Sequence, residues 1–266
     1  MRPVIFIGAE RVGKAVLESL LKKRKNIVAV FTAHPSLKEK IADYVDYKDL
    51  EKKYPQVDFY YIRNSRDISV VRDIAGYKPE VILVVSWSQI IPPEILKIPK
   101  KGVVGLHYSL LPKRRGGAPL NWAIIEGLRK SGITLFYMDQ KLDHGDIIAQ
   151  REFNIRDSET VKDLLEKIEA MAPSLILQYF DLITNGRAVR TKQNDNIATY
   201  TKRRIPKDSI IDWSLSLEKI YNFIRALVPP YLPAFSNIGN KKVYFTAVEK
   251  LSSKKLKIEG YITDED

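Results

Sequence analysis

The chain has 266 residues and 45% hydrophobic content, enough to bury one large core or one core with a small satellite domain. It has no cysteine, which excludes disulfides and thiolate metal sites, and no apolar run reaches the ~18 residues of a membrane span. The formal net charge of +12 favours anionic partners, although an excess of lysine is also common on ordinary solvated surfaces. We see no secretory signal pattern, so we expect a cytoplasmic protein with no membrane partner.

Strand-like and helix-like patterns alternate through the first third of the chain. Short apolar runs predict strands at residues 3–7, 26–32, 57–62 and 81–86, and amphipathic spacing predicts helices at residues 12–21, 38–53 and 68–77. Such alternation builds βαβ units and a parallel sheet. The predicted fold class is α/β, a Rossmann-like, mostly parallel sheet with helices on both faces.

The turn after the first predicted strand resembles a phosphate-binding loop without matching it. Residues 8–15 read G-A-E-R-V-G-K-A, close to G-x-x-x-x-G-K-[ST], but Ala15 replaces the hydroxyl that would hold Mg²⁺. The G-x-G-x-x-G pattern of dinucleotide-binding proteins is also missing. A nucleoside triphosphate and a nicotinamide cofactor are therefore both poorly supported. The simpler interpretation is a tight turn whose helix N-terminus attracts an anion.

Two candidate catalytic residues follow two predicted strands in the middle of the chain. A strand at residues 102–106 ends at His107, and a strand at residues 133–138 precedes a loop with Asp143. Catalytic groups in open parallel sheets lie beyond the carboxyl ends of strands, so we expect these two side chains within direct or one-water hydrogen-bond reach. A histidine held by an aspartate can transfer protons near neutral pH and, as a cation, stabilise an oxyanion. The alternative is a cleft-lining histidine beside a solvated aspartate.

The remainder of the chain predicts a linker and a small β-rich end. Helical patterns cover residues 119–126, 161–183 and 217–227, and short strands are expected at residues 234–238, 242–248 and 255–262. The expected organisation is a first domain at residues 1–190, a linker at residues 191–207 and a small C-terminal domain at residues 208–266. The linker is basic, and we expect it to be a solvated segment. No metal-ligand spacing and no G-x-S-x-G elbow are present.

The central stretch, residues 104–150, resembles the folate-dependent formyltransferases that act on methionyl-tRNA, glycinamide ribonucleotide and nucleotide-linked amino sugars. Their shared pattern is N-x-H-x-S-L-L-P-x-x-R-G-x-x-P, followed by T-G-V-T and D-x-G-x-I. The matching residues here are His107, Ser109, Leu110, Leu111, Pro112, Arg115, Gly116, Pro119, Ser131 to Thr134, and Asp143 to Ile147. The resemblance extends to residues 86–91 and 199–226, and so covers most of the chain.

This resemblance implies transfer of a formyl group from N10-formyltetrahydrofolate to a primary amine. His107, oriented by Asp143, would stabilise the oxyanion, and Asp143 would accept the amine proton. The third catalytic residue of the family, an asparagine, is replaced here by Gly105. We expect the small Gly105 to leave space for another donor, which could be a backbone N–H, a water or Asn121. If no donor serves, the alternative is a non-catalytic binding protein on the same fold.

The resemblance also implies two binding regions. The residues expected to bind the folate are Ser86, Trp87, Gln89, Ile91, Leu142 and Asp146. Those expected to bind the amine substrate, including its anionic portion, are Glu10, Arg11, Ser109 and Arg115. The basic insertion and longer C-terminal barrel of the tRNA enzymes are missing, so the sequence favours a nucleotide-linked amino sugar over methionyl-tRNA. The oligomeric state is not indicated.

Overall fold

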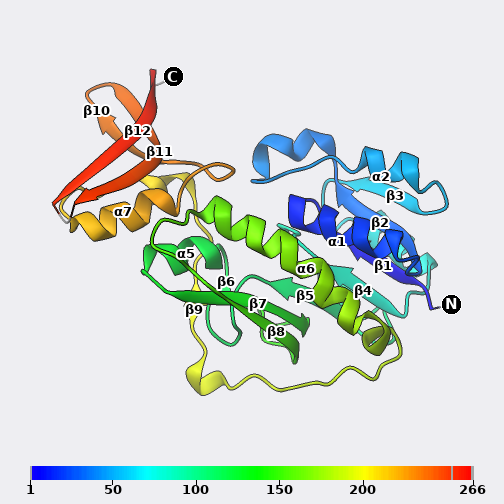
Figure 1. The fold of residues 1–266 in the computed structure, drawn as a ribbon. Coiled ribbons are helices and arrows are strands. Elements are labelled where there is room, and N and C mark those ends of the chain that lie inside the picture. The colour runs from blue at the N-terminus through cyan, green and yellow to red at the C-terminus, as the bar shows by residue number, and fades with distance from the viewer. Residues whose placement is uncertain (1, 253, 265–266) are drawn as a thin grey trace.

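The structure is a computed structural model that describes residues 2–252 and 254–264 (Figure 1). Its main sheet has seven strands in the order β3-β2-β1-β4-β5-β7-β8. The five parallel strands are β1 (Val4–Ile7), β2 (Ile27–Ala33), β3 (Asp58–Ile62), β4 (Val81–Val84) and β5 (Val103–His107), and the antiparallel strands are β7 (Lys130–Tyr137) and β8 (Ile147–Asn154). The predicted fold class is confirmed.

Helices cover both faces of this sheet because strands β1, β2, β4 and β5 have apolar side chains on both sides. One face packs against α1 (Arg11–Lys22), α2 (Lys48–Lys53), α5 (Pro119–Ile125) and α6 (Val161–Thr184). The other packs against α3 (Ile68–Gly76) and α4 (Pro93–Leu96). We call them the α1/α6 face and the α3/α4 face.

The order of the strands reverses between β1 and β4, which makes this pair the topological switch point of the sheet. Ligands of such sheets bind in the crevice beyond the carboxyl ends of these strands. The turns after β1 and β4 meet there, since the Ala9 N–H donates to the Ser86 carbonyl oxygen at 3.1 Å. Gly8 is needed for this approach, because a Cβ on it would lie 2.5 Å from the Val85 carbonyl oxygen.

The structure corrects one local prediction and adds one strand that was not predicted. The helix expected at residues 38–53 is replaced by a 3-10 helix, η1 (Pro35–Lys40), an irregular segment at residues 41–47, and α2. Asp43 interrupts the helix with φ +60°. Strand β8 was not predicted, and it lies at the edge of the sheet, where its exposed residues weaken the hydrophobic signal.

The C-terminal part has its own antiparallel sheet but shares the core of the main sheet. It consists of α7 (Leu217–Arg225), β10 (Ala234–Ile238), β11 (Lys241–Ser252) and β12 (Lys255–Asp264). In Figure 1, α7 lies next to α5 and below the three strands. Ile220 and Ile224 of α7 belong to the same apolar cluster as α1 and α6.

Residues 191–204, which we call the strap, connect α6 to the C-terminal part. The strap contains the 3-10 helix η2 (Asp195–Ile197) and β9 (Tyr200–Thr201), and a further 3-10 helix, η3 (Pro206–Ser209), follows it. Strand β9 pairs in parallel with the short β6 (Arg115–Gly116). Most side chains of the strap are solvated, as expected. The pairing of β9 with β6 nevertheless attaches the strap to the main domain. No helix of the described residues is both long and apolar enough to cross a membrane.

Candidate active site

His107 is the last residue of β5, and its side chain is buried at the carboxyl end of that strand, with 8% of the residue exposed. Its Nε2 lies 2.7 Å from the Arg114 carbonyl oxygen. A carbonyl oxygen only accepts hydrogen bonds, so Nε2 carries the proton. Nδ1 is therefore the ring nitrogen left for chemistry.

Asp143 lies next to this nitrogen, but not for the reason expected from the sequence. Strand β7 is antiparallel to β5, with Val104 opposite Tyr137, so β7 ends at the amino end of β5. The loop at residues 138–146 folds back and places Asp143 Oδ2 3.6 Å from His107 Nδ1. This separation is too long for a direct hydrogen bond and makes an ion pair when the imidazole is protonated.

The Asp143 carboxylate is oriented by the backbone of the segment between His107 and α5. Its Oδ2 accepts a hydrogen bond from the Gly116 N–H at 2.8 Å. Two residues later, a Cβ on Gly145 would lie 1.8 Å from the Tyr137 carbonyl oxygen, so the fold-back requires glycine there. The pair is therefore held by backbone contacts that bring together β6 and the loop after β7.

The strap fixes the loop that carries Asp143, a feature that the sequence analysis missed. Gln193 donates through Nε2 to the carbonyl oxygens of Asp143 at 2.9 Å and Gly145 at 2.7 Å. Its Oε1 accepts from Nε and Nη2 of Arg115, at 3.0 and 2.9 Å, and Arg115 also pairs with Asp195 at 2.8 Å. No local pattern in the sequence marks Gln193, because its partners are 48 to 78 residues away.

Arg115 and Ser109 were expected to bind substrate, but in this structure their side chains form hydrogen bonds within the protein. Arg115 is 0% exposed, and its guanidinium is surrounded by Gln193, Asp195 and Tyr200. The buried Ser109 donates its hydroxyl proton to the Lys113 carbonyl oxygen at 2.6 Å. Their polar groups are thus used within the protein, and a direct contact of either residue with substrate stays a prediction.

Gly105 does not open the space that the sequence analysis expected. A Cβ placed on it would lie 3.0 Å from Phe136 Cε1, 3.1 Å from Met138 Cγ and 3.2 Å from Met138 Sδ. The position of the family asparagine is therefore filled by an aromatic ring and a thioether. Asn121 does not replace the missing donor either. It is buried on α5, on the α1/α6 face, and donates to the Ala226 carbonyl oxygen, whereas Met138 packs on the α3/α4 face.

Most of the residues expected to bind the folate lie near the end of the sheet that carries His107, whereas Asp146 lies beside Tyr137, level with the amino end of β5. Trp87 packs with Met138 against the core of the α3/α4 face, and its indole N–H is buried with no partner among the described residues. Ile90 and Leu142 are apolar but 66% and 55% exposed. Exposed apolar side chains and an available buried donor fit a flat heteroaromatic ligand.

The other expected folate residues have supporting contacts. Ile91 is buried in the core below this loop. The Gln89 side chain donates to the Arg63 carbonyl oxygen and accepts from the Ser65 N–H. The Ser86 hydroxyl forms a hydrogen bond with the Tyr108 hydroxyl. The backbone carbonyl of Asp146 accepts from Tyr137. These residues shape the loops, and their contact with the ligand stays a prediction.

A basic cleft of about 470 Å³ lies at the carboxyl ends of β2, β3 and β4. It contains four cationic side chains and no carboxylate. Its lining residues are Leu37, Lys40, Ile41, Arg63, Asn64, Ser65, Arg66, Ser88, Gln89, Ile90 and Arg203. The strap supplies Arg203, so the cleft is at the same edge of the sheet as the His107 loop. Its charge suits an anionic ligand.

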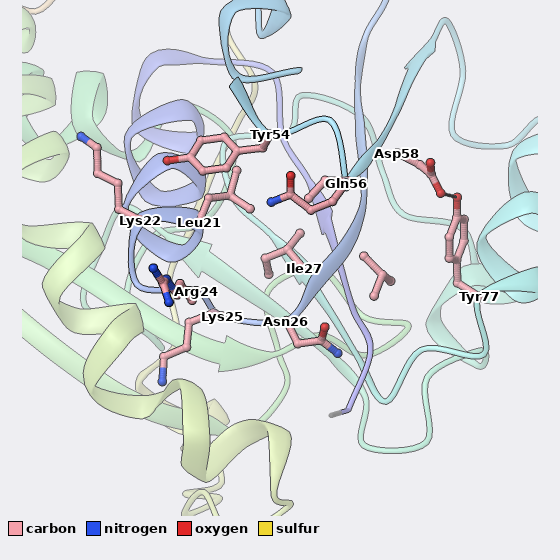
Figure 2. Close-up of a pocket in the computed structure, with 12 residues that line it drawn as sticks. Leu21, Lys22, Arg24, Lys25, Asn26, Ile27, Tyr54, Gln56, Asp58 and Tyr77 are labelled. Carbon is pink, nitrogen blue, oxygen red and sulfur yellow. Dashed lines mark hydrogen bonds between the residues drawn. The ribbon is translucent and has the colours of Figure 1, made fainter. Parts of the chain in front are cut away.

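A larger groove, of about 800 Å³, lies at the opposite edge of the sheet (Figure 2). Lys22, Arg24 and Lys25, at the end of α1, line it together with Asn26 and Asp58 at the amino ends of β2 and β3. His107 is at the other end of the strands. This groove is therefore not part of the candidate active site.

Glu10 and Arg11, also expected to bind substrate, lie in the crevice at the switch point. Arg11 Nη2 is 2.8 Å from Asp43 Oδ1, in the irregular segment before α2. Glu10 is partly buried, and burial, followed by the charge of Asp43, raises the pKa of its carboxyl to about 8. The structure thus brings Glu10 and Arg11 to the same edge as His107 and Asp143.

A doubly wound sheet with a buried histidine–aspartate pair, exposed apolar side chains and a basic cleft at one edge is typical of an α/β enzyme that binds an anionic ligand beside an acid–base pair. The family model described as formyl transferase matches residues 1–179, and the model of the formyl transferase C-terminal domain matches residues 204–266. The chain belongs to the formyl transferase family. It is a formyltransferase that uses N10-formyltetrahydrofolate.

Individual relatives differ in their acceptors. The chain is 35% identical to a methionyl-tRNA formyltransferase of Fusobacterium nucleatum over 92% of this chain and 79% of that protein. The structure of a methionyl-tRNA formyltransferase from Clostridium thermocellum superposes with a TM-score of 0.75, 23% identity and full coverage of both chains. WlaRD, a sugar 3N-formyl transferase determined in the presence of dTDP and 5-N-formyl-THF, superposes with a TM-score of 0.68, 18% identity and 98% coverage of both.

Proposed function

We propose that the acceptor amine of this formyltransferase belongs to methionyl-tRNA. The observation that carries this proposal is the 35% identity to a methionyl-tRNA formyltransferase along nearly the whole chain. The basic cleft at the carboxyl ends of β2 to β4 supports it, since four cations without a carboxylate suit a phosphate backbone. This acceptor replaces the amino sugar that the sequence analysis favoured.

A nucleotide-linked amino sugar is the second candidate. It is favoured by the short segment between β2 and α2, which has no basic insertion. The likeness to WlaRD agrees with it at the level of the fold. Both acceptors are anionic, so net charge alone does not separate them.

In either case the chemistry rests on the His107–Asp143 pair. The bound folate supplies the formyl carbon. The Nε2–H of His107 donates to the Arg114 carbonyl oxygen, which stabilises the imidazolium and leaves a protonated Nδ1 as a donor for charge developing on the formyl oxygen. Asp143 keeps one oxygen on the Gly116 N–H, and its other oxygen is available to accept a proton from the attacking amine and to return it to N10 of the tetrahydrofolate leaving group as the bond from N10 to the formyl carbon breaks. Phe136 and Met138, which occupy the place of the family asparagine, exclude water beside the imidazole.

The test compares formyl transfer to initiator methionyl-tRNA and to a dTDP-linked 4-amino-4,6-dideoxysugar, together with the salt dependence of acceptor binding. Each phosphate contact makes the slope of the logarithm of the binding constant against the logarithm of the salt concentration more negative by about 0.7–0.9. We expect formylation of the tRNA and a slope steeper than about −3. A sugar diphosphate, with two phosphates, gives a slope no steeper than about −2.

Variants that remove a positive charge test whether the phosphates of the tRNA bind in the basic cleft. Arg63→Ala and Arg66→Ala, in the basic cleft, should weaken tRNA binding and flatten the salt slope by about 1 each. Lys22→Ala, in the groove of Figure 2 at the other edge, is the matched control and should leave both quantities unchanged. Formylation of the sugar alone would overturn the proposal.

A further inference from the structure

His144 follows Asp143 directly in the chain, and both nitrogens of its ring have a carboxylate partner. Nδ1 lies 2.7 Å from Asp139 Oδ2, and Nε2 lies 3.3 Å from Asp195 Oδ2. Carboxylate oxygens only accept hydrogen bonds, so the imidazole donates from both nitrogens and is protonated in this arrangement. Asp139 belongs to the same loop as Asp143, whereas Asp195 belongs to the strap. The His144 side chain therefore connects the loop to the strap.

The two carboxylates that contact His144 are each held by a second donor. Asp139 Oδ1 accepts from the Lys141 N–H at 2.8 Å, which closes a turn inside the loop. Asp195 Oδ1 lies 2.8 Å from Nη2 of Arg115, which is fully buried. The hydrogen bond from Arg115, and after it the one from His144, lowers the pKa of Asp195. Each carboxylate thus has one oxygen on a fixed donor and the other on the imidazole.

These contacts close into a ring that contains the catalytic carboxylate. From His144 the ring passes through Asp195 to the guanidinium of Arg115. The residue after Arg115 is Gly116, whose N–H donates to Asp143 Oδ2 at 2.8 Å. Asp143 is joined to His144 by the peptide bond, which completes the ring. The carboxylate of Asp143 and the side chain of the next residue are therefore both attached to the segment around Arg115.

The backbone of Asp143 needs such support. Its φ is +49°, in the left-handed region that few residues with a side chain adopt. A conformation of this kind persists only where the surroundings hold it. Gln193 holds the carbonyl groups on either side of His144, and His144 adds the only other side-chain contact to the strap that starts between them. Without the His144 contact, the loop can relax and move the carboxylate away from His107 Nδ1, which is 3.6 Å from it.

We propose that His144 is a positioning residue, which holds the Asp143 carboxylate beside His107 through its hydrogen bond to Asp195. The family pattern D-x-G-x-I leaves this position open, so the assignment is a property of this chain. Both ring nitrogens are occupied, so His144 acts through Asp143 and not on the substrate. The assignment rests on the proposed function, in which Asp143 accepts the proton of the amine.

Two substitutions separate the two hydrogen bonds of the imidazole. The amide nitrogen of asparagine occupies about the place of Nδ1, so His144→Asn keeps the contact with Asp139 and loses the one with Asp195. The amide nitrogen of glutamine reaches about as far as Nε2, so His144→Gln keeps the contact with Asp195. We expect kcat to fall about 10-fold in His144→Ala and His144→Asn, less than the ~10²-fold cost of a 1 Å displacement, and less than about 3-fold in His144→Gln.

Binding and stability measurements distinguish positioning from a general structural role. The Kd of 5-formyltetrahydrofolate should stay within about 2-fold of the unmodified protein in all three variants, because the loss is confined to the transition state. Tm should change little, because the His144 side chain is 28% exposed and exposed ion pairs contribute little to stability. The matched control is His34→Ala, which removes a ring whose side-chain contact is with the nearby Ser36, and it should leave kcat and Kd unchanged.

A double variant tests the contact across the two segments. Asp195→Asn removes the charge but keeps an acceptor for Arg115. Because His144→Ala and Asp195→Asn open the same contact, the double variant should lower kcat no more than the more damaging single variant. Multiplied losses would overturn the inference.

Asp143→Asn separates the inference from the proposed function. The kcat is measured with whichever of the two acceptors is formylated, and transfer to neither overturns both. Full kcat in Asp143→Asn also overturns both, because the position of Asp143 then has no consequence. Loss of kcat in Asp143→Asn without loss in His144→Ala and His144→Asn overturns the inference alone. Equal losses in His144→Asn and His144→Gln, or a loss of folate affinity in step with kcat, would do the same.

Discussion

At the scale of single residues, the position that most distinguishes this chain from its family is Gly105. The family pattern has an asparagine there, two residues before the catalytic histidine, and both side chains would lie on the same face of β5. In this protein the place is filled from the neighbouring strand by Phe136 and from the loop by Met138. The site is therefore repacked around glycine, and the missing amide is not replaced by an open cavity.

The repacking makes Gly105→Asn a test with a defined direction. The new side chain meets atoms at 3.0–3.2 Å, and overpacking of this kind typically costs about 1–3 kcal/mol. We expect Gly105→Asn to lower both Tm and kcat. Combining it with Met138→Ala should recover more stability than the two single effects predict, which a double-mutant cycle measures. Recovery of kcat in the double variant would show that the asparagine still has a role beside His107. Additive losses would contradict the proposed contact.

At the scale of elements, the strap controls the loop that presents Asp143. A single side chain, Gln193, connects the backbone of that loop to the buried guanidinium of Arg115. Removing it leaves two carbonyl oxygens and part of a buried guanidinium without partners. The loop can then move relative to His107, whose Nδ1 is already 3.6 Å from the carboxylate.

Gln193→Ala should therefore reduce catalysis through position alone. The reference variant is Asp143→Asn, which removes the charge but keeps an acceptor for the Gly116 N–H. We expect it to lower kcat by about 10²–10³. Gln193→Ala should give a smaller loss, a decrease in stability of about 1–3 kcal/mol, and faster hydrogen exchange at residues 138–146. Asn196→Ala, an exposed neighbour in η2, is the control. Loss of folate binding in step with kcat would instead assign Gln193 to the shape of the pocket.

At the scale of the whole molecule, the C-terminal part is continuous with the core of the main sheet. Buried residues of α7 and of the segment before β10 pack in the same cluster as α1 and α6. The Asn121–Ala226 hydrogen bond, at 2.8 Å, and the packing of Tyr231 against the same cluster add to this connection. The C-terminal part therefore stabilises the main domain as well as its own sheet.

We expect thermal unfolding in a single transition for this reason. Ile224→Ala, which empties a fully buried position on α7, should lower the stability of the whole chain by about 2–5 kcal/mol without splitting the transition. Differential scanning calorimetry measures both quantities. Ile238→Ala, on an exposed position of β10, should have little effect. A second, smaller transition that alone responds to Ile224→Ala would show independent domains.

The sequence by itself determined the fold class and the two residues at the centre of the site. Periodicity and apolar runs are local properties, so β1 to β5, α1, α6 and α7 could be predicted from them. The motif around His107 and Asp143 is also local, and its resemblance to formyltransferases led directly to the family. Element boundaries failed where one residue decides the backbone, as at Asp43.

Only the tertiary structure decided how these residues are used, because the deciding contacts join positions far apart in the chain. The antiparallel direction of β7 means that a folded-back loop, and not the end of a strand, brings Asp143 to His107. Packing from Met138 closes the space at Gly105, and Gln193 reaches the site from the strap. The burial that raises the pKa of Glu10 arises from elements brought together by folding, because the burial of a carboxyl group depends on all of its neighbours.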